Sequence, residues 1–448
     1  MRDPVLLLLL LGACLWTLRR PWVGAITWTV VSLGSPHVAF GWSAADWPVA
    51  TAVAVCTLVG ILLTTDRDNP FASPAPVAVL ALMIWFCITL PFSFDLELSL
   101  PLWERSMKIF LMLFVTMALL NTRKKLDVFI WSMAISIGYF GVKGGVFTLV
   151  TGGNYRIWGP GGFIGGNNEL ALALIMTIPM MRYLQLQSPS KWIRRGLVCA
   201  MALAAIAAIG TYSRGALLGM ASMLLFFVWR SDRKLVWGIS ILLFAVLLLP
   251  LMPDTWWERM DTIRTYGEDN SAQGRLTAWA MAWNLARDRL IGGGFMVALP
   301  SVYAIYAPEA TTSLVAHSIY FQLMGEHGFI GLFVFLLVGV LTWVDAAELR
   351  RTYAGHADLK WAADLGSMMQ VSMIGFAVTG AFLSMAYFDL PYNVMAVSSL
   401  ALRIARREAA KGSAAGQVQS AQSPGHEPSP DRGRHDRAAA RESASVLP

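Results

Sequence analysis

The sequence predicts an all-α, polytopic membrane protein with about 12 or 13 transmembrane helices and one large external loop. Of its 448 residues, 56% are hydrophobic and only 14% are charged, far from the composition of an ordinary soluble domain. Its 18 tryptophans fit a protein with many bilayer interfaces, where amphipathic rings accumulate. The net charge of +7 is dispersed between apolar runs, so we expect no nucleic-acid partner.

Thirteen apolar runs of near-membrane length account for the predicted spans. They lie at about residues 5–18, 21–34, 48–64, 76–93, 106–120, 126–150, 169–187, 196–212, 215–229, 235–251, 314–344, 361–387 and 390–403. The first two are short for the roughly 20 residues that a bilayer requires, so they either share one crossing or lie partly re-entrant. The opening MRDPVLLLLLLGACL resembles a secretion signal, but Asp3 offsets Arg2 and many apolar runs follow, which favours a first membrane helix.

Basic loops determine the predicted orientation. Five groups of Lys and Arg are expected in the cytoplasm by the positive-inside rule, at residues 123–125, 191–195, 230–234, 350–351 and from 403 onward. Three segments then fall on the outer side of the membrane. These are the loop from Thr151 to Asn168, the turn at Ser213 and Arg214, and the long loop from Leu251 to Ser313. The orientation of the N-terminus stays open.

These features divide the chain into five predicted regions. They are an N-terminal membrane region (1–195), membrane helices around the Ser213 turn (196–250), the large outer loop (251–313), C-terminal membrane helices (314–407) and a tail (408–448). From Glu408 onward, Ala, Ser, Gly, Pro, Gln and charged residues predominate, as in a disordered cytoplasmic tail, so His426 and His435 are not expected to be ligands. The four cysteines lie in apolar runs without CxxC spacing, which supports neither a disulfide nor a metal site.

The strongest candidate site residues collect on the predicted outer side. Arg214 stands in the turn of TYSRGALLGM, where a positive charge departs from the positive-inside rule; this favours function over a snorkelling turn residue. Arg275 opens a predicted amphipathic helix, where a guanidinium and free amides can meet an anion; an exposed arginine at a helix start is the alternative. His317 is expected at the outer mouth, where the long loop re-enters the membrane. The helix that Arg275 opens has an apolar stripe, which consists of Leu276, Trp279, Trp283, Ala286 and Leu290.

The glycine-rich outer segment TGGNYRIWGPGGFIGGNN contributes further candidates. Arg156 stands beside aromatic residues and can help to hold a sugar or a phosphate. Asn167 and Asn168 can bind substrate, although an Asn cap at the start of the following helix explains Asn168 equally well.

A third group of candidates lies deeper in the membrane. Glu326 follows His317 by nine residues, about 14 Å along a helix at ~1.5 Å per residue. This depth favours a buried polar pair with His327, while Glu326 is kept as a candidate substrate-binding residue. Glycines recur every three residues here, at Gly325, Gly328 and Gly331, and would let a neighbouring helix approach closely.

Arginines and a histidine at the outer mouth of an apolar bundle suit a lipid-linked pyrophosphate donor. Guanidinium groups bind phosphate in a bidentate manner and can neutralise a leaving pyrophosphate. A histidine, with an ordinary pKa near 6.5, suits a general base for an acceptor hydroxyl. No acidic cluster lies on the outer side, so we expect no metal and no other cofactor, and we predict a metal-independent, inverting glycosyl transfer. The alternative is a flippase or exporter, although transporters more often have matching halves with charges near the bilayer midplane.

The motifs resemble those of a known family. Four segments carry the resemblance: GVKGGVFTLVTGGNYRIWGPGGFIGGNNELALALIMTIPM, TYSRGALLGM, WWERMDTIRTYGEDNSAQGRLTAWAMAWNLA and VAHSIYFQLMGEHGFIGLFVF. They are similar to the exosortase A-associated O-glycosylation ligases, a branch of the O-antigen ligase and polymerase superfamily. The likeness covers about residues 1–405, with the motifs in the same order.

The resemblance implies a glycosyltransferase bundle of the GT-C-like kind, in the inner membrane of a Gram-negative bacterium, with its active site facing the periplasm. It also implies an undecaprenyl-pyrophosphate-linked glycan as donor. Arg214 and Arg275 would bind the pyrophosphate, and His317 would act on the acceptor or as a base. Ser318 follows that histidine where ligases of the superfamily often have Asn, which leaves the acceptor side open. The acceptor can be a lipid, a protein or a growing polysaccharide, so ligase and polymerase both remain.

Overall fold

The computed structural model describes residues 2–40, 47–261 and 270–422. Within these ranges the chain forms helices joined by turns and loops, with no strand, which confirms the all-α prediction. Each predicted apolar run lies largely within one helix. These helices are α1 (Arg2–Arg19), α2 (Pro21–Gly34), α4 (Val49–Leu63), α5 (Pro74–Thr89), α6 (Leu96–Leu119), α7 (Arg123–Val150), α8 (Asn167–Gln187), α9 (Lys191–Gly210), α10 (Arg214–Arg230), α11 (Lys234–Leu248), α15 (Ile319–Tyr353), α16 (Lys360–Gly380) and α17 (Asp389–Gln422).

The lengths and compositions of these helices support a polytopic membrane protein. Five helical segments among the described residues are long and apolar enough to cross a membrane: Pro74–Phe92, Arg123–Val150, Asn167–Gln187, Lys191–Gly210 and Ile319–Tyr353. Helices α4 and α11 are apolar but shorter. The total of 12 or 13 spans stays a prediction.

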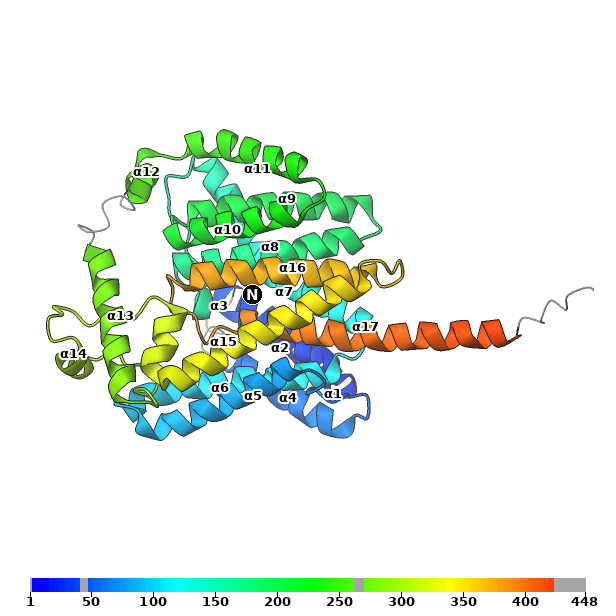
Figure 1. Ribbon diagram of the computed structural model, residues 1–448, viewed down its shortest axis with the longest axis horizontal. Helices are drawn as coiled ribbons and strands as arrows, with labels where there is room; N and C mark the ends of the chain where they lie inside the picture. Colours follow the sequence, from blue (N-terminus) through cyan, green and yellow to red (C-terminus); the bar gives the residue numbers. More distant parts are fainter. Residues whose placement is uncertain (1, 41–46, 262–269, 423–448) are drawn as a thin grey trace, which may run out of the picture. The chain divides into compact units, whose positions relative to one another are not determined.

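Residues 1–405 form one compact unit, in which α8 is the most enclosed of the five segments. The most apolar 18-residue stretch of α8 is 72% buried inside the protein, against 33% for the corresponding stretch of α15. Helix α8 is therefore central, whereas α15 exposes much of its surface. Helix α8 packs between α9 and α16, while α15 packs on α16 and α5 (Figure 1). The boundaries predicted at residues 195, 250 and 313 fall inside this unit.

Three shorter helices form most of the described part of the long loop, at one end of the unit. They are α12 (Asp254–Asp261), α13 (Asn270–Asp288) and α14 (Pro300–Tyr306). Figure 1 shows them in green, with α12 beside the end of α11 and with α13 and α14 near the start of α15. Helices α13 and α14 share a small core that includes Ala278, Leu285 and Val302. The loop is therefore a packed element that can position side chains.

Helix α13 confirms the predicted helix but corrects two of its details. It begins at Asn270, so Arg275 lies inside the helix and its backbone amide is not at the free end. The predicted stripe is shifted as well, because Ala286 is buried whereas Leu276, Trp283 and Leu290 are exposed. Smaller residues form the buried face, namely Ala278, Met281, Ala282 and Leu285. The sequence has two apolar stripes, and the narrower side chains allow α13 to lie close to its neighbours.

The predicted tail begins inside α17, which continues to Gln422, and its disorder stays a prediction. The stretch from Glu408 to Gln422 is rich in Ala and Gln, which have high helix propensities, and it contains no proline. Composition that cannot build a buried core can still extend an existing helix. Residues 423–448, with His426 and His435, lie outside the described residues.

Candidate functional site

A pocket lies where the first turns of α8 and α10 meet α12, α13 and the end of α16. It encloses about 350 Å³ with its open mouth included. Its lining residues are Asn168, Tyr212, Ser213, Arg214, Gly215, Arg259, Arg275, Thr379, Phe382 and Leu383. We call this the arginine pocket.

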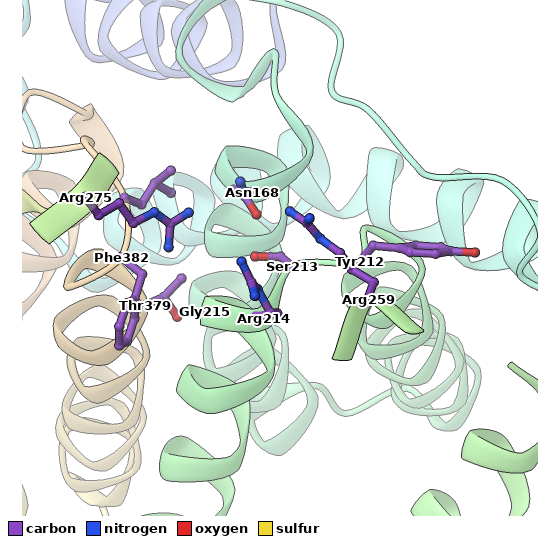
Figure 2. A pocket seen from close by; sticks show the side chains of 10 residues that line it. Asn168, Tyr212, Ser213, Arg214, Gly215, Arg259, Arg275, Thr379 and Phe382 are labelled. Atoms are coloured by element: carbon purple, nitrogen blue, oxygen red, sulfur yellow. The ribbon is translucent and has the colours of Figure 1, made fainter. Parts of the chain in front are cut away.

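Three arginines from three different helices line the pocket. Arg214 is the first residue of α10, Arg259 lies in α12, and Arg275 lies in the second turn of α13. Figure 2 shows their guanidinium groups extending toward the same space below Asn168. Guanidinium groups stay charged at any physiological pH, so this convergence creates a permanent positive potential suited to a polyanion.

The start of α10 adds backbone donors to the positive charge. Ser213 is the N-cap residue, and its hydroxyl accepts a hydrogen bond from the amide of Ala216 at 3.3 Å. The amides of Arg214 and Gly215, which also line the pocket, belong to the first turn of the helix, which has no preceding helical carbonyls to bind. A helix N-terminus favours an anion through these amides and the helix dipole.

The turn that presents Arg214 is held by three neighbouring segments. The amide of Ile157 donates to the Gly210 carbonyl at 3.1 Å, and the indole N–H of Trp256 donates to the Ile209 carbonyl at 3.1 Å. The Asn167 side-chain amide donates to the Thr211 carbonyl at 2.8 Å. The α9–α10 turn therefore depends on the glycine-rich loop, the start of α8 and α12 for its position.

Tyr212 is the strained residue of that turn. Its φ of 61° lies in the left-handed region, which costs a non-glycine residue about 1–2 kcal/mol. The Tyr212 hydroxyl donates to the Gly153 carbonyl at 2.6 Å, and the guanidinium of Arg156 lies over the ring, 5.6 Å from its centroid. Arg156 is thus not a lining residue of the arginine pocket, but it contacts a side chain that is.

The two asparagines have different surroundings. The N-cap of α8 is Gly166 and no side chain caps this helix end, so the prediction that Asn168 is a helix cap is wrong. Asn167 ties α8 to the turn before α10, whereas Asn168 lines the arginine pocket beside Arg214. The backbone bends at Gly166 to start the helix, which leaves the Asn168 side chain available to the pocket.

His317 lies in the short segment between α14 and α15, next to α13. Its φ of 45° is also left-handed, and its neighbours fix the segment: the Trp279 indole donates to the Ala316 carbonyl at 2.7 Å, and the Tyr303 hydroxyl donates to the Leu314 carbonyl at 2.6 Å. Burial lowers the pKa of His317, and the positive charge of Arg275 lowers this pKa further. His317 does not line the arginine pocket, but it lies within the electrostatic reach of Arg275.

Glu326 and His327 form the predicted buried polar pair, and Tyr387 joins them. The Tyr387 hydroxyl donates to Oε2 of Glu326 and lies 2.7 Å from Nε2 of His327. Oε1 of Glu326 accepts from the Met296 amide at 3.2 Å, and Nδ1 of His327 lies 2.7 Å from the Thr89 hydroxyl. Glu326 is 6% exposed and does not line the arginine pocket, so these contacts favour a structural role over substrate binding.

The three recurring glycines do allow close approaches, though not only to helices. Gly325 faces Ala282 of α13, and Gly331 faces Trp85 of α5. Gly328 has a φ of 69°, which bends α15, and a Cβ at this position would overlap the Leu290 carbonyl. The end of α13 and the bend in α15 are therefore in direct contact.

Several pocket residues were absent from the sequence-based prediction. Arg259 is one of five arginines in the long loop, and its residue type alone does not separate it from Arg264 or Arg287. Thr379 lies in the last turn of α16 and Phe382 follows that helix, both more than a hundred residues from Arg275 in sequence. The segment WWERMD that carries Arg259 offered a weak signal, because paired tryptophans beside a charge indicate a packed helix rather than an open loop.

Comparison with known families assigns part of the chain. Residues 199–336 match the family model described as O-antigen ligase. This match supports the O-antigen ligase superfamily. Together with the apolar helices, it supports a membrane protein with a glycan ligase or polymerase type of function. Residues 1–188 match a family of unknown function, DUF5935, and no curated protein matches the chain.

The arginine pocket draws on both matched segments. The O-antigen ligase segment contains the three arginines and His317, while Asn168 lies in the DUF5935 segment. Thr379, Phe382 and Leu383 lie outside both matches. Completion of the pocket therefore requires residues from outside the O-antigen ligase segment.

Proposed function

We propose that this protein transfers a glycan from an undecaprenyl-pyrophosphate donor to an acceptor at the periplasmic face of the bacterial inner membrane. The observation that supports this most strongly is the convergence of Arg214, Arg259 and Arg275 with the start of α10 in one pocket. The pyrophosphate of the donor would lie there. Guanidinium groups and helix amides stabilise the charge that develops as the glycosidic bond to the pyrophosphate breaks.

In this proposal His317 acts as the general base. The acceptor hydroxyl attacks the anomeric carbon of the donor sugar from the side opposite the pyrophosphate, and its proton passes to His317. The bond from carbon to pyrophosphate oxygen breaks, the configuration inverts, and undecaprenyl pyrophosphate leaves with both electrons. A lowered pKa keeps the His317 imidazole neutral, and so able to accept a proton, at neutral pH.

The acceptor distinguishes a ligase from a polymerase. The motifs that resemble exosortase A-associated ligases favour transfer to a lipid or protein acceptor, and the polymerase alternative uses the same donor pocket with a growing polysaccharide. A flippase or exporter of the same lipid is the other alternative, because an arginine pocket can also line the path of an anionic headgroup.

The test uses purified protein, an undecaprenyl-linked donor and each class of acceptor. We expect release of undecaprenyl pyrophosphate, and we expect Arg275→Ala and His317→Ala to abolish that release while the proteins remain folded. Arg287→Ala, an exposed arginine on the same helix, is the matched control and should keep full activity. Full activity of both site variants would refute the proposed site. Translocation of lipid in vesicles without a new glycosidic bond would instead establish the transporter.

A further inference from the structure

A second group of arginines lies at the far end of α10 from the arginine pocket. Arg230 is the last residue of α10, and Arg350 and Arg351 lie in the last turn of α15. Along α10, Arg230 is about 24 Å from Arg214, at ~1.5 Å per residue. Figure 1 shows the turns that follow α10 and α15 at the end of the unit away from α13 and α14. In the predicted orientation this end faces the cytoplasm. We call Arg230, Arg350 and Arg351 the second arginine cluster.

The three positive charges of the cluster act on one another. The charge of Arg351 acts on Arg230 and on Arg350, and the charge of Arg230 acts on Arg350. Partial burial lowers the pKa of Arg230, and the charge of Arg351 lowers this pKa further. A guanidinium does not lose its proton at physiological pH, so the repulsion among the three groups persists unless an anion offsets it.

The described part of the chain supplies no such anion. None of its carboxylates forms an ion pair with a member of the cluster. The Arg230 guanidinium donates a long hydrogen bond, 3.5 Å, to the neutral side chain of Gln370. Nε of Arg350 is buried and has no hydrogen-bond partner among the described residues. A buried donor without a partner is costly, so this group is suited to an acceptor from outside the chain.

Other basic residues of the predicted cytoplasmic loops do have a counter-ion. Lys125 pairs with Asp66 at 2.8 Å, and Arg403 pairs with Asp68 at 3.7 Å. The positive-inside rule explains why basic residues lie at this end of the helices. It does not explain why three of them share one place without a carboxylate.

The surroundings of the cluster are those of a membrane–water boundary. The rings of Phe226 and Trp343 lie 5.7 Å apart and connect α10 with α15 about one to two turns before the arginines. The Arg230 guanidinium lies over the rings of Phe226 and Trp229, 5.1 and 5.9 Å from their centroids. Trp229 and Val344 are 66% and 50% exposed, so apolar surface adjoins the charges. A ligand that satisfies both features carries an anion joined to hydrocarbon.

We propose that the second arginine cluster binds the headgroup of a phospholipid with two phosphates, as in cardiolipin. One phosphate would leave two of the three cations without an opposite charge, whereas two phosphates offset most of it. Guanidinium groups bind phosphate oxygens in a bidentate manner, and basic pockets between membrane helices on the cytoplasmic side suit such headgroups. The acyl chains would lie along the exposed apolar surfaces of α10 and α15. This site is independent of the proposed function, because none of its residues lines the arginine pocket.

The experiment measures lipid binding to the full-length protein, purified in detergent and stripped of lipid. Native mass spectrometry would follow titrations with cardiolipin, phosphatidylglycerol and phosphatidylethanolamine. We expect the wild-type protein to bind cardiolipin most tightly. Arg351→Gln is the main variant, because its side chain is exposed and its loss leaves the fold intact. We expect its Kd for cardiolipin to rise about fivefold or more, since a basic residue near a membrane surface contributes ~1 kcal/mol to the binding of an anionic lipid.

Two further variants complete the design. Arg195→Gln removes an exposed positive charge from the start of α9, outside the cluster, and should leave the Kd unchanged. Arg350→Gln removes the buried Nε and should weaken cardiolipin binding more than Arg351→Gln does. Cardiolipin should raise the Tm of the wild-type protein and not that of Arg350→Gln, which separates loss of the site from loss of the fold.

Three results would overturn the inference. Equal affinity for cardiolipin and phosphatidylethanolamine would mean that the cluster does not recognise an anionic headgroup. Phosphatidylglycerol bound as tightly as cardiolipin would exclude a site for two phosphates. Equal weakening by Arg351→Gln and Arg195→Gln would mean that the overall charge of this face, rather than the cluster, attracts the lipid. None of these measurements depends on glycan transfer, so their outcome leaves the proposed function untouched.

Discussion

Tyr387, in the segment between α16 and α17, donates a hydrogen bond to Glu326, in the first half of α15. Glu326 in turn accepts a hydrogen bond from the Met296 amide, which follows α13. Both side chains are buried, and no more than 6% of either is exposed. This contact joins two segments that lead into the arginine pocket, since α13 carries Arg275 and the segment before Tyr387 carries Phe382 and Leu383.

Replacement of Tyr387 by Phe should therefore destabilise the protein. It removes the donor to the Glu326 carboxyl and the hydroxyl next to His327, and a buried polar group that loses its partner costs about 1–3 kcal/mol. We expect a lower Tm for the detergent-solubilised protein in a thermal unfolding assay. Tyr155→Phe removes a hydroxyl from an exposed ring and serves as the control, with an unchanged Tm. Identical melting of the two variants would show that the buried hydroxyl contributes nothing.

Arg259 is expected to contribute to donor binding although its sequence context did not identify it. Arg259→Ala removes one of three cations from the pocket, and a charge-assisted hydrogen bond to phosphate is worth about 1.5–3 kcal/mol, so KM for the donor should rise about tenfold or more. Steady-state kinetics with varied donor concentration would measure this. Arg195→Ala is the control and should leave KM unchanged, because the exposed Arg195 lies near the start of α9, at the end of that helix far from the arginine pocket. A KM that stays at the wild-type value would exclude Arg259 from the donor site.

The pH dependence of transfer should reflect His317. A general base must be neutral, so activity falls on the acid side as the imidazole gains a proton. Burial and the charge of Arg275 lower the pKa of His317, so this fall should have its midpoint below the ordinary histidine value of 6.5. A profile of kcat/KM against pH would locate the midpoint.

Two substitutions of Arg275 separate its charge from its shape. Arg275→Lys retains the positive charge, so the acid midpoint should remain where it is in the wild-type protein. Arg275→Gln removes one of the two causes of the lowered pKa, and the midpoint of any residual activity should move to higher pH. An acid limb that ignores both substitutions would argue against His317 as the titrating group.

The extent to which sequence predicts this molecule follows from the range of the forces involved. The helices could be predicted, because a segment that crosses lipid must satisfy its own backbone hydrogen bonds and carry a continuous apolar run. Arg214 could be identified from its place in a turn that breaks the expected charge distribution. The contact of Asn167 with Thr211 could not, because it depends on how two distant segments approach in space.

The errors have equally local causes. The helix was predicted to begin at Arg275, but α13 begins at Asn270, and Gly274 lies within the helix, where its missing side chain makes room for Leu314. Arg259 was missed because an arginine in a long loop has no distinctive pattern until the loop is folded. Buried partners such as Tyr387 were missed because a lone tyrosine at the end of a predicted apolar run has many ordinary explanations.

The bend in α15 gives the last prediction, for Gly328→Ala. With a φ of 69°, Gly328 is in a conformation that costs an alanine about 1–2 kcal/mol, and the added Cβ would also overlap the Leu290 carbonyl. We expect a clear loss of thermal stability together with weaker donor binding, because the end of α13 must move away from α15 and Arg275 moves with it. Gly238→Ala, in open space on α11, is the control and should be neutral or stabilising by up to about 1 kcal/mol. Equal stability of the two variants would mean that α15 tolerates a straight path at residue 328, and that the position of α13 does not depend on the bend.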